Sequence, residues 1–197
     1  MNFKKLEITG FKSFSEKTNF FIENGLTGIV GPNGCGKSNI VESLRWCMGE
    51  NSAKSMRGSG MEDVIFSGTS NRPSKNISEV ALLLDNQNKG GPSQYKEFNE
   101  ISVRRKIEKD KGSKYYINDK EVRARDVQTF FADMSTGAHS PSLISQGKIG
   151  QLVTAKPIER KSILEEAAGI SGIHARRQEA ETRLNAAENN LKRADEL

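Results

Sequence analysis

Alternating apolar and polar residues predict β-strands near the beginning of the chain. Leu6 and Ile8 alternate with polar neighbours, which predicts a strand over residues 3–9. Two further apolar runs, Phe20–Ile22 and Gly25–Val30, are predicted as strands joined by a two-residue turn.

The middle of the chain has the pattern of an antiparallel sheet. Val80–Leu84 is a continuous apolar run, which predicts a well-buried strand. Residues 101–107 and 115–117 alternate, and Asn118-Asp119 suits a hairpin turn because both residue types tolerate left-handed backbone angles. Polar segments predicted as loops cover residues 51–76, 87–94 and 135–151.

Helical spacing of apolar residues occurs in three places before residue 170. Residues 38–48 carry apolar positions on one helical face, and Gly49 is a good C-terminal stop. Residues 127–134 are predicted as a short helix. Pro157 suits a first helical turn, and the helix that it opens is predicted to end at Gly169.

After Ser171 the character of the chain changes. No Gly, Pro or aromatic residue occurs from residue 175 onward, and a heptad spacing links Ala180, Leu184, Ala187, Leu191 and Ala194. This spacing predicts the start of a coiled-coil arm over residues 171–197. The alternative is an ordinary amphipathic surface helix, because about three heptads are marginal evidence. The pattern runs to Leu197 without a C-cap, so we expect a truncated arm whose partner helix lies outside this chain.

Composition excludes several classes of protein. No stretch of the 197 residues is long and apolar enough to span a bilayer, and the N-terminus lacks the apolar core of a signal peptide. Cys35 and Cys47 have no metal-site spacing and are not expected to form a disulfide. We therefore expect a cytoplasmic protein with no membrane partner. The net charge of +5 permits nucleic-acid contact. The candidate basic patches are Lys54 with Arg57, Arg104-Arg105-Lys106, and Lys109, Lys111 and Lys114.

Residues 31–38 point most directly to a ligand. They read Gly-Pro-Asn-Gly-Cys-Gly-Lys-Ser, which matches G-x-x-x-x-G-K-[ST] between a predicted strand and a predicted helix. The glycines let the backbone wrap a polyphosphate, and the helix N-terminus favours an anion. Lys37 is expected to reach the β- and γ-phosphates of a nucleoside triphosphate, and the Ser38 hydroxyl to ligate Mg²⁺. The alternative is a glycine-rich turn ahead of an ordinary helix.

The acidic half of an ATPase site is missing from the pattern. Such a site needs an acidic residue at the end of an apolar strand and a residue that positions the attacking water. Asp85, after Leu82-Leu83-Leu84, is the only local candidate, but no Glu follows it. A strand ending at a polar turn is the favoured interpretation, so the sequence predicts half of an ATPase site.

Several strings, taken in order along the chain, resemble one family. They are residues 8–14, 31–40, 44–50, 52–58 with 61–66, 144–148 and 165–170. These strings look like the opening strand, phosphate loop, first helix, arginine loop, glutamine loop and neck of an SMC head, the N-terminal head segment of the structural-maintenance-of-chromosomes ATPases. The resemblance is to the bacterial form and covers essentially the whole chain.

The resemblance implies a mixed α/β fold: the N-terminal half of an ABC-type P-loop ATPase head, with an antiparallel β-subdomain and a C-terminal coiled-coil helix. Residues 1–170 would form the N-terminal lobe, and residues 171–197 the start of the arm. The implied partners are the C-terminal half of the same head, a second SMC head in a homodimer, a kleisin-type subunit and double-stranded DNA. ATP and Mg²⁺ are the implied cofactors, and the implied location is the nucleoid.

The resemblance also implies roles for individual residues. Gln146 would bring its amide oxygen to Mg²⁺ and help to place the attacking water. Arg57 would lie near the γ-phosphate or the head–head interface, with a solvated loop arginine as the alternative. Lys12 and Ser13 would approach the nucleotide from a neighbouring turn. Backbone and side chains around the phosphates would come from Asn33, Gly34, Cys35, Gly36, Lys37, Ser38 and Asn39.

Two strings depart from the family pattern, and three alternative functions stay open. Asn118-Asp119 stands where relatives usually have Asn-Gly, and the string around His139 is unusual for the loop before Gln146. The alternatives are the half-head of a coiled-coil double-strand-break repair ATPase, the nucleotide-binding domain of a membrane transporter, and a module that binds nucleotide without turnover.

Overall fold

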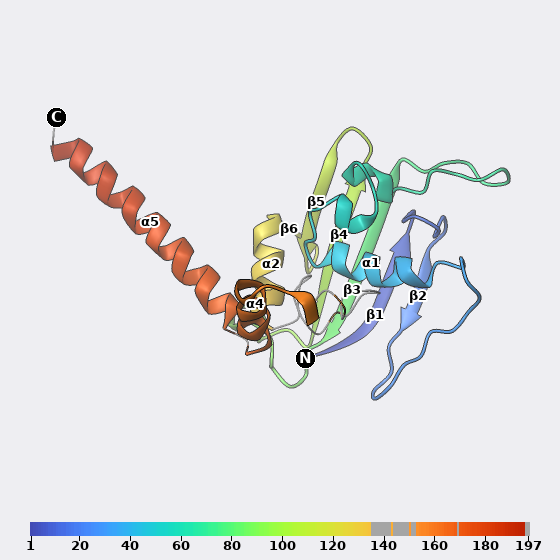
Figure 1. The fold of residues 1–197 in the computed structure, drawn as a ribbon, viewed down its shortest axis with the longest axis horizontal. Helices are drawn as coiled ribbons and strands as arrows, with labels where there is room; N and C mark the ends of the chain where they lie inside the picture. Colours follow the sequence, from blue (N-terminus) through green and yellow to red (C-terminus); the bar gives the residue numbers. More distant parts are fainter. Residues whose placement is uncertain (135–142, 144–149, 151–152, 169, 196–197) are drawn as a thin grey trace.

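Six antiparallel strands form one sheet in the computed structural model, which describes residues 1–134, 143, 150, 153–168 and 170–195 (Figure 1). The strands are β1 (Asn2–Thr9), β2 (Thr18–Phe21), β3 (Ile77–Asp85), β4 (Glu100–Glu108), β5 (Gly112–Ile117) and β6 (Lys120–Val122). Their order is β2-β1-β3-β4-β5-β6, and every neighbouring pair is antiparallel. The predicted antiparallel section is therefore confirmed.

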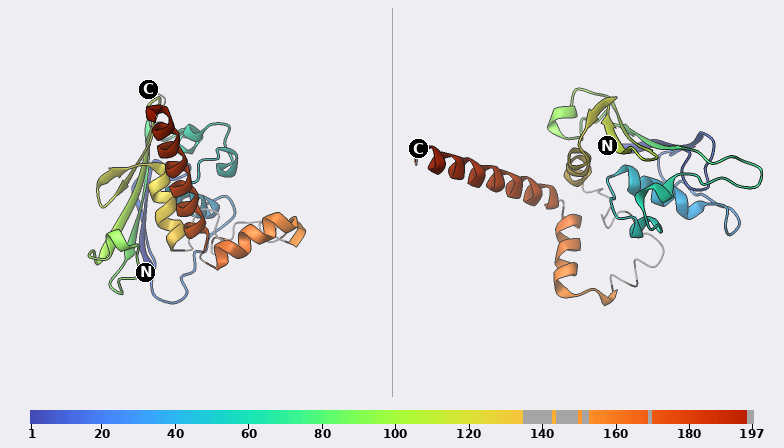
Figure 2. Two further views of the ribbon diagram at one scale, coloured as in Figure 1. Left: turned by 90° about the vertical axis from the view of Figure 1, so that its left-hand side faces the viewer. Right: turned by 90° about the horizontal axis from the view of Figure 1, so that it is seen from above.

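Helices cover one face of this sheet. The described helices are α1 (Lys37–Cys47), α2 (Ala124–Asp133), α4 (Pro157–Ala167) and α5 (Ser171–Asp195), with short 3-10 turns η1 (Lys54–Met56), η2 (Met61–Val64) and η3 (Ser93–Tyr95). Both views in Figure 2 place α1 and α2 on the same side of the sheet. The mixed α/β architecture that the sequence predicts is confirmed.

The core lies between that sheet face and the two helices. Every second residue of the central strands is buried, as the period-2 pattern requires. The buried apolar set includes Leu6, Ile8, Val80, Leu82, Leu84, Ile101 and Val103 from the strands, with Trp46 and Cys47 from α1 and Phe130 and Phe131 from α2. At about 1.5–3 kcal/mol for each large apolar side chain, this burial is what anchors α1 to the sheet.

Most predicted elements lie within a few residues of the observed ones. The helix expected over 38–48 is α1, and Gly49, at φ 101°, follows its end. The hairpin turn also forms as predicted, because Asn118 and Asp119 have φ values of 47° and 61°. The predicted strand at Phe20–Ile22 starts two residues earlier in the structure, as β2.

The strand predicted over Gly25–Val30 is wrong. Residues 22–33 have no strand in the structure, and the side chains of Leu26 and Val30 are 99% and 94% exposed. A strand needs a neighbour to accept and donate its backbone hydrogen bonds. In the only sheet of the described residues, β2 is the edge strand and pairs with β1 alone. No strand of this sheet lies where residues 25–30 could pair with it.

The final helix leaves the body of the molecule. Figure 1 shows α5 running from the end near α2 and α4 outward to the C-terminus. Leu184 and Leu191 are both well exposed, so the predicted heptad positions that can be described face solvent. The helix is confirmed, whereas its pairing in a coiled coil stays a prediction. No helix in the described part of the chain is long and apolar enough to cross a membrane.

Candidate phosphate-binding site

Gly36 is the point at which the predicted phosphate loop meets α1. It is the N-cap of the helix and has φ 95°, a backbone angle that only glycine adopts without strain. A Cβ added to Gly36 would lie 2.5 Å from the Ser13 hydroxyl oxygen. Gly34, at φ 82°, makes the other left-handed turn of the loop. The backbone angles at both positions therefore require glycine, which supports the phosphate-loop interpretation.

The N-terminus of α1 is open toward this loop. No side chain caps it, and no acidic residue lies in its first turn. The first N–H groups of a helix and its dipole favour an anion, so this end is suited to a phosphate group. Ser38, the second residue of α1, is exposed at the same end.

The Lys37 ammonium lies across the loop. Its Nζ donates to the carbonyl oxygens of Gly31 and Pro32 at 2.5 and 2.6 Å and lies 3.8 Å from the Cys35 sulfur. The cationic group is thus hydrogen-bonded to the start of the loop whose last residue, Gly36, is the N-cap of α1. Asn33, Gly34 and Cys35 form the exposed outer side of the loop.

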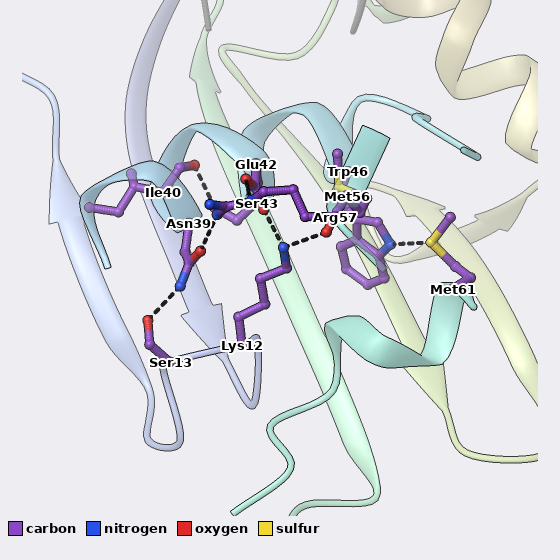
Figure 3. A network of polar contacts seen from close by, with 10 residues as sticks. All are labelled: Lys12, Ser13, Asn39, Ile40, Glu42, Ser43, Trp46, Met56, Arg57 and Met61. Atoms are coloured by element: carbon purple, nitrogen blue, oxygen red, sulfur yellow. Dashed lines mark hydrogen bonds and ion pairs between the residues drawn. The ribbon is translucent and has the colours of Figure 1, made fainter. Parts of the chain in front are cut away.

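Three predicted site residues are joined side by side although they are far apart in sequence. The Asn39 side-chain amide donates to Ser13 Oγ at 2.9 Å, and its oxygen accepts from Arg57 Nη2 at 2.9 Å (Figure 3). Ser13 comes from the turn after β1, Asn39 from the first turn of α1, and Arg57 from the residue that follows η1. The fold therefore brings these three segments to one side of the phosphate loop.

Glu42 connects the two remaining cations, and sequence reasoning missed it. Its carboxylate forms ion pairs with Lys12 and, at 2.5 Å, with Arg57 Nε. Lys12 Nζ also donates to the Met56 carbonyl at 2.5 Å. The available signal was position, because Glu42 lies three residues after Asn39, on the same helix face, among buried neighbours.

Asp85 is excluded from the site by its place in the sheet. Asp85 pairs with Asn2 at the start of β1, whereas Ser13 follows the end of β1. Eight residue steps of β3 separate the two ends by roughly 26 Å. The Asp85 carboxylate accepts a hydrogen bond from the Gln87 backbone N–H at 3.0 Å. The interpretation of a strand that ends at a polar turn is confirmed.

The candidate basic patches need one correction. Arg105 is buried, not exposed: its Nη1 donates to the carbonyls of Trp46 and Glu50 at 2.9 and 2.7 Å. Its guanidinium also lies 4.4 Å from the Trp46 ring centre, and burial lowers the pKa of Arg105 to about 10. The alternating pattern of β4 explains the error, because Arg104 and Arg105 must point to opposite faces of the sheet.

Two predicted features fall outside what can be described. Gln146 and His139 both lie outside the described residues. Among the described residues, no group of three or more His, Cys, Asp and Glu side chains could hold a metal ion. The described donors suit a Mg²⁺ ion only through the Ser38 hydroxyl, with the remaining ligands coming from the nucleotide or from elsewhere.

Comparison with known proteins agrees with this geometry. The family model of the RecF/RecN/SMC N-terminal domain matches residues 2–148. The chain is 56% identical over its whole length to the chromosome partition protein Smc of Cereibacter sphaeroides, but it spans only 17% of the length of that curated relative.

Two solved structures are similar as well. One was described in work on ATP-driven dimerization and DNA-stimulated activation of SMC ATPases; it shares 31% identity and a TM-score of 0.72 over 85% of this chain and 99% of that chain. The other is an Smc head domain of Pyrococcus furiosus with an extended coiled coil, bound to the C-terminal domain of ScpA. It shares 32% identity and a TM-score of 0.78 over 98% of this chain and 48% of that chain.

Proposed function

The chain belongs to the RecF/RecN/SMC N-terminal domain family, and we propose that it is the ATP-binding N-terminal half of an SMC-type ATPase head. In the whole protein this head acts in chromosome condensation and segregation through ATP-driven engagement of two heads. The observation that carries the proposal is the open N-terminus of α1, with Lys37 lying across a glycine-shaped loop.

Each residue of the site has a role in this proposal. Lys37 binds the β- and γ-phosphates, and Ser38 holds Mg²⁺, which neutralises charge that develops on the phosphates. Arg57 and Lys12 add positive charge from the neighbouring segments, and Gln146 supplies the second Mg²⁺ contact. The loop and first turn contribute the backbone and side chains of Ser13, Asn33, Gly34, Cys35, Gly36 and Asn39.

The proposed first partner is the C-terminal half of the same head. That half would supply the acidic residues that Asp85 cannot supply. The exposed apolar side chains of Leu26, Ile29 and Val30 lead directly into the phosphate loop. A strand from the second half would pair with this segment and cover it. Residues 1–170 would then be one lobe and residues 171–197 the start of the arm.

The remaining partners are a second head, a kleisin-type subunit and double-stranded DNA in the nucleoid. The ScpA-bound Smc head of Pyrococcus furiosus supports the kleisin partner. For DNA, Lys106 and Lys114 lie directly opposite each other on β4 and β5, and like charges in that position favour an anionic partner. The relatives named chromosome partition proteins favour this function over double-strand-break repair.

The test combines this chain with a matching C-terminal head half and measures ATP binding and turnover, with and without DNA. Lys37→Ala should abolish ATP binding, whereas Lys96→Ala, an exposed lysine in the loop before β4, should leave it unchanged. If the assembled wild-type head fails to bind ATP, the proposal is wrong. Binding without any turnover would instead favour a nucleotide-binding module.

A further inference from the structure

Glu42 is a nearly buried carboxylate in the middle of α1. Its side chain is only 11% exposed, and both of its oxygens face cations: Oε2 faces Lys12 and Oε1 faces Arg57 (Figure 3). A buried carboxylate is stable only when it is paired. The pairing here joins α1 to two segments that are 30 and 15 residues away in sequence, the turn after β1 and the residue after η1.

Lys12 and Arg57 both have strained backbone conformations. Lys12 has φ 46° and Arg57 has φ 55°, a left-handed region that side chains adopt at a cost of about 1 kcal/mol or more. Such conformations persist where surrounding contacts hold them. For Arg57 these contacts are the backbone bond from its N–H to Lys54, the bond from Nη2 to Asn39, and the ion pair with Glu42.

The pairing leaves part of Arg57 free to bind a ligand. A guanidinium has five N–H donors; Arg57 Nε lies in the ion pair with Glu42, and one Nη2–H donates to Asn39. Within the described residues, the other three N–H groups, on Nη1 and Nη2, have no acceptor, and the side chain is 57% exposed. Because Asn39 lies in the first turn of α1 and also holds Ser13, these donors lie beside the helix end that faces the phosphate loop.

We propose that Glu42 is a positioning residue that fixes Arg57 beside the phosphate loop, with Lys12 held by the same carboxylate. An arginine held in advance loses little side-chain freedom when a phosphate binds, whereas a free one loses up to about 2 kcal/mol of rotamer entropy. The inference rests on the proposed function only for the identity of the ligand, a nucleoside triphosphate.

The first experiment needs no nucleotide and uses the chain itself. Hydrogen exchange is measured at the amides of Arg57 and Gly58, which donate to Lys54 and Ala53 at 3.0 and 2.9 Å. Glu42→Gln should raise their exchange about tenfold and leave β4 and β5 unchanged. Glu79→Gln is the matched control, because Glu79 pairs with Arg104. Unchanged exchange in Glu42→Gln would overturn the proposal whatever the nucleotide does.

The second experiment is a double-mutant cycle in the head assembled with its C-terminal half. Glu42→Gln should weaken ATP binding about tenfold and ADP binding by less than about threefold, and it should have little further effect in Arg57→Ala. Equal losses for ATP and ADP, or losses that add in the double variant, would show a purely structural role. If wild type and Lys37→Ala fail equally to bind nucleotide, the proposed function is wrong, and hydrogen exchange alone decides the role of Glu42.

Discussion

At the scale of single residues, Gly36 links the covalent geometry of the loop to the polar contacts around it. A Cβ on Gly36 would lie 2.5 Å from the Ser13 hydroxyl oxygen, so a side chain there would displace the hydroxyl that accepts from Asn39. Asn39 in turn accepts from Arg57. One glycine therefore controls the position of three side chains.

Gly36→Ala should destabilise the protein and weaken ATP binding. The positive φ costs about 1–2 kcal/mol, and the displaced Ser13 hydroxyl costs about 1 kcal/mol more. Gly25→Ala is the control, because Gly25 also has positive φ but an added Cβ there has no neighbour within 4 Å. Urea unfolding and nucleotide titration measure both effects. A Gly36→Ala variant with no more loss than Gly25→Ala would contradict the steric argument.

Cys47 makes stability depend on pH in the alkaline range. Burial raises the pKa of its thiol to about 12 from 9.0. Because the folded state holds the proton more tightly, its stabilising effect is complete below pH 9 and is lost as the pH rises toward 12. Wild type should lose about 1 kcal/mol of unfolding free energy between pH 9 and 10 relative to Cys47→Ala. Urea unfolding of both proteins at each pH measures this difference. If the difference in unfolding free energy between wild type and Cys47→Ala does not change from pH 9 to 10, the assignment is wrong.

The sequence predicted those site residues whose role depends on local pattern. Gly36, Lys37 and Ser38 are recognisable because they lie within eight consecutive residues. Glu42 is not, because its importance depends on two cations that the tertiary fold delivers from distant segments. Lys12 and Arg57 were reached through the family resemblance, since no local spacing joins them.

At the scale of elements, the C-terminal end of α1 is tied to the sheet by a buried arginine. Arg105 of β4 donates to the last-turn carbonyl of Trp46 and to the carbonyl of Glu50, just beyond the helix. Its guanidinium lies between the rings of Trp46 and Tyr115. A cation at this end also complements the helix dipole, so the arginine orients the helix whose other end faces the phosphate loop.

Arg105→Met should destabilise the protein by about 3 kcal/mol or more, because the Glu50 carbonyl loses its Arg105 donor and the Trp46 carbonyl keeps only the Gly49 N–H. Arg105→Lys should recover only part of the loss, since an ammonium lacks the planar fork. Arg104→Met, one residue earlier and on the other face, should cost less than about 1 kcal/mol because its ion pairs are partly exposed. Guanidinium unfolding compares the three. Equal losses for Arg104→Met and Arg105→Met would contradict the assignment.

Helices and strands were predictable where an apolar pattern and the segment that packs on it or pairs with it occur in the same chain. The apolar run in β3 and the alternation in β4 are satisfied by packing on α1, so both strands form near the expected residues. Residues 25–30 have an equally clear apolar pattern, but the described fold offers them no strand to pair with. An apolar pattern indicates that a segment can form a strand, but the segment forms one only where a second strand pairs with it.

At the scale of the whole molecule, two of the exposed apolar segments have no partner among the residues that the structure describes. One is the segment through Leu26 and Val30, and the other is the line of Leu184 and Leu191 on α5. Both adjoin parts that the family resemblance assigns to a longer protein, and the chain spans 17% of the length of its curated relatives.

Assembly with the C-terminal head half should protect the first of these surfaces. Backbone amides of residues 26–30 should exchange rapidly in the isolated chain and at least about tenfold more slowly in the assembled head, because strand pairing satisfies them. Hydrogen exchange read by mass spectrometry gives both rates. The turn at Asn118-Asp119, which is already paired within this chain, provides the internal reference. Unchanged exchange at residues 26–30 would show that the second half binds elsewhere.

The order of strands in the sheet also delays the pairing of β1 while the chain is being synthesised on the ribosome. β1 ends at Thr9 and lies between β2 and β3, but β3 begins only at Ile77. At about 5–20 residues per second, the nascent chain waits roughly 3–14 seconds for this second neighbour. During that interval Leu6 and Ile8 lack their pairing partners on β3, and the turn at Gly10 lacks the Ile77 backbone against which it packs. Of all neighbouring strands in the described sheet, β1 and β3 are the farthest apart in sequence, so β1 is most exposed to chaperones and proteases before β3 emerges.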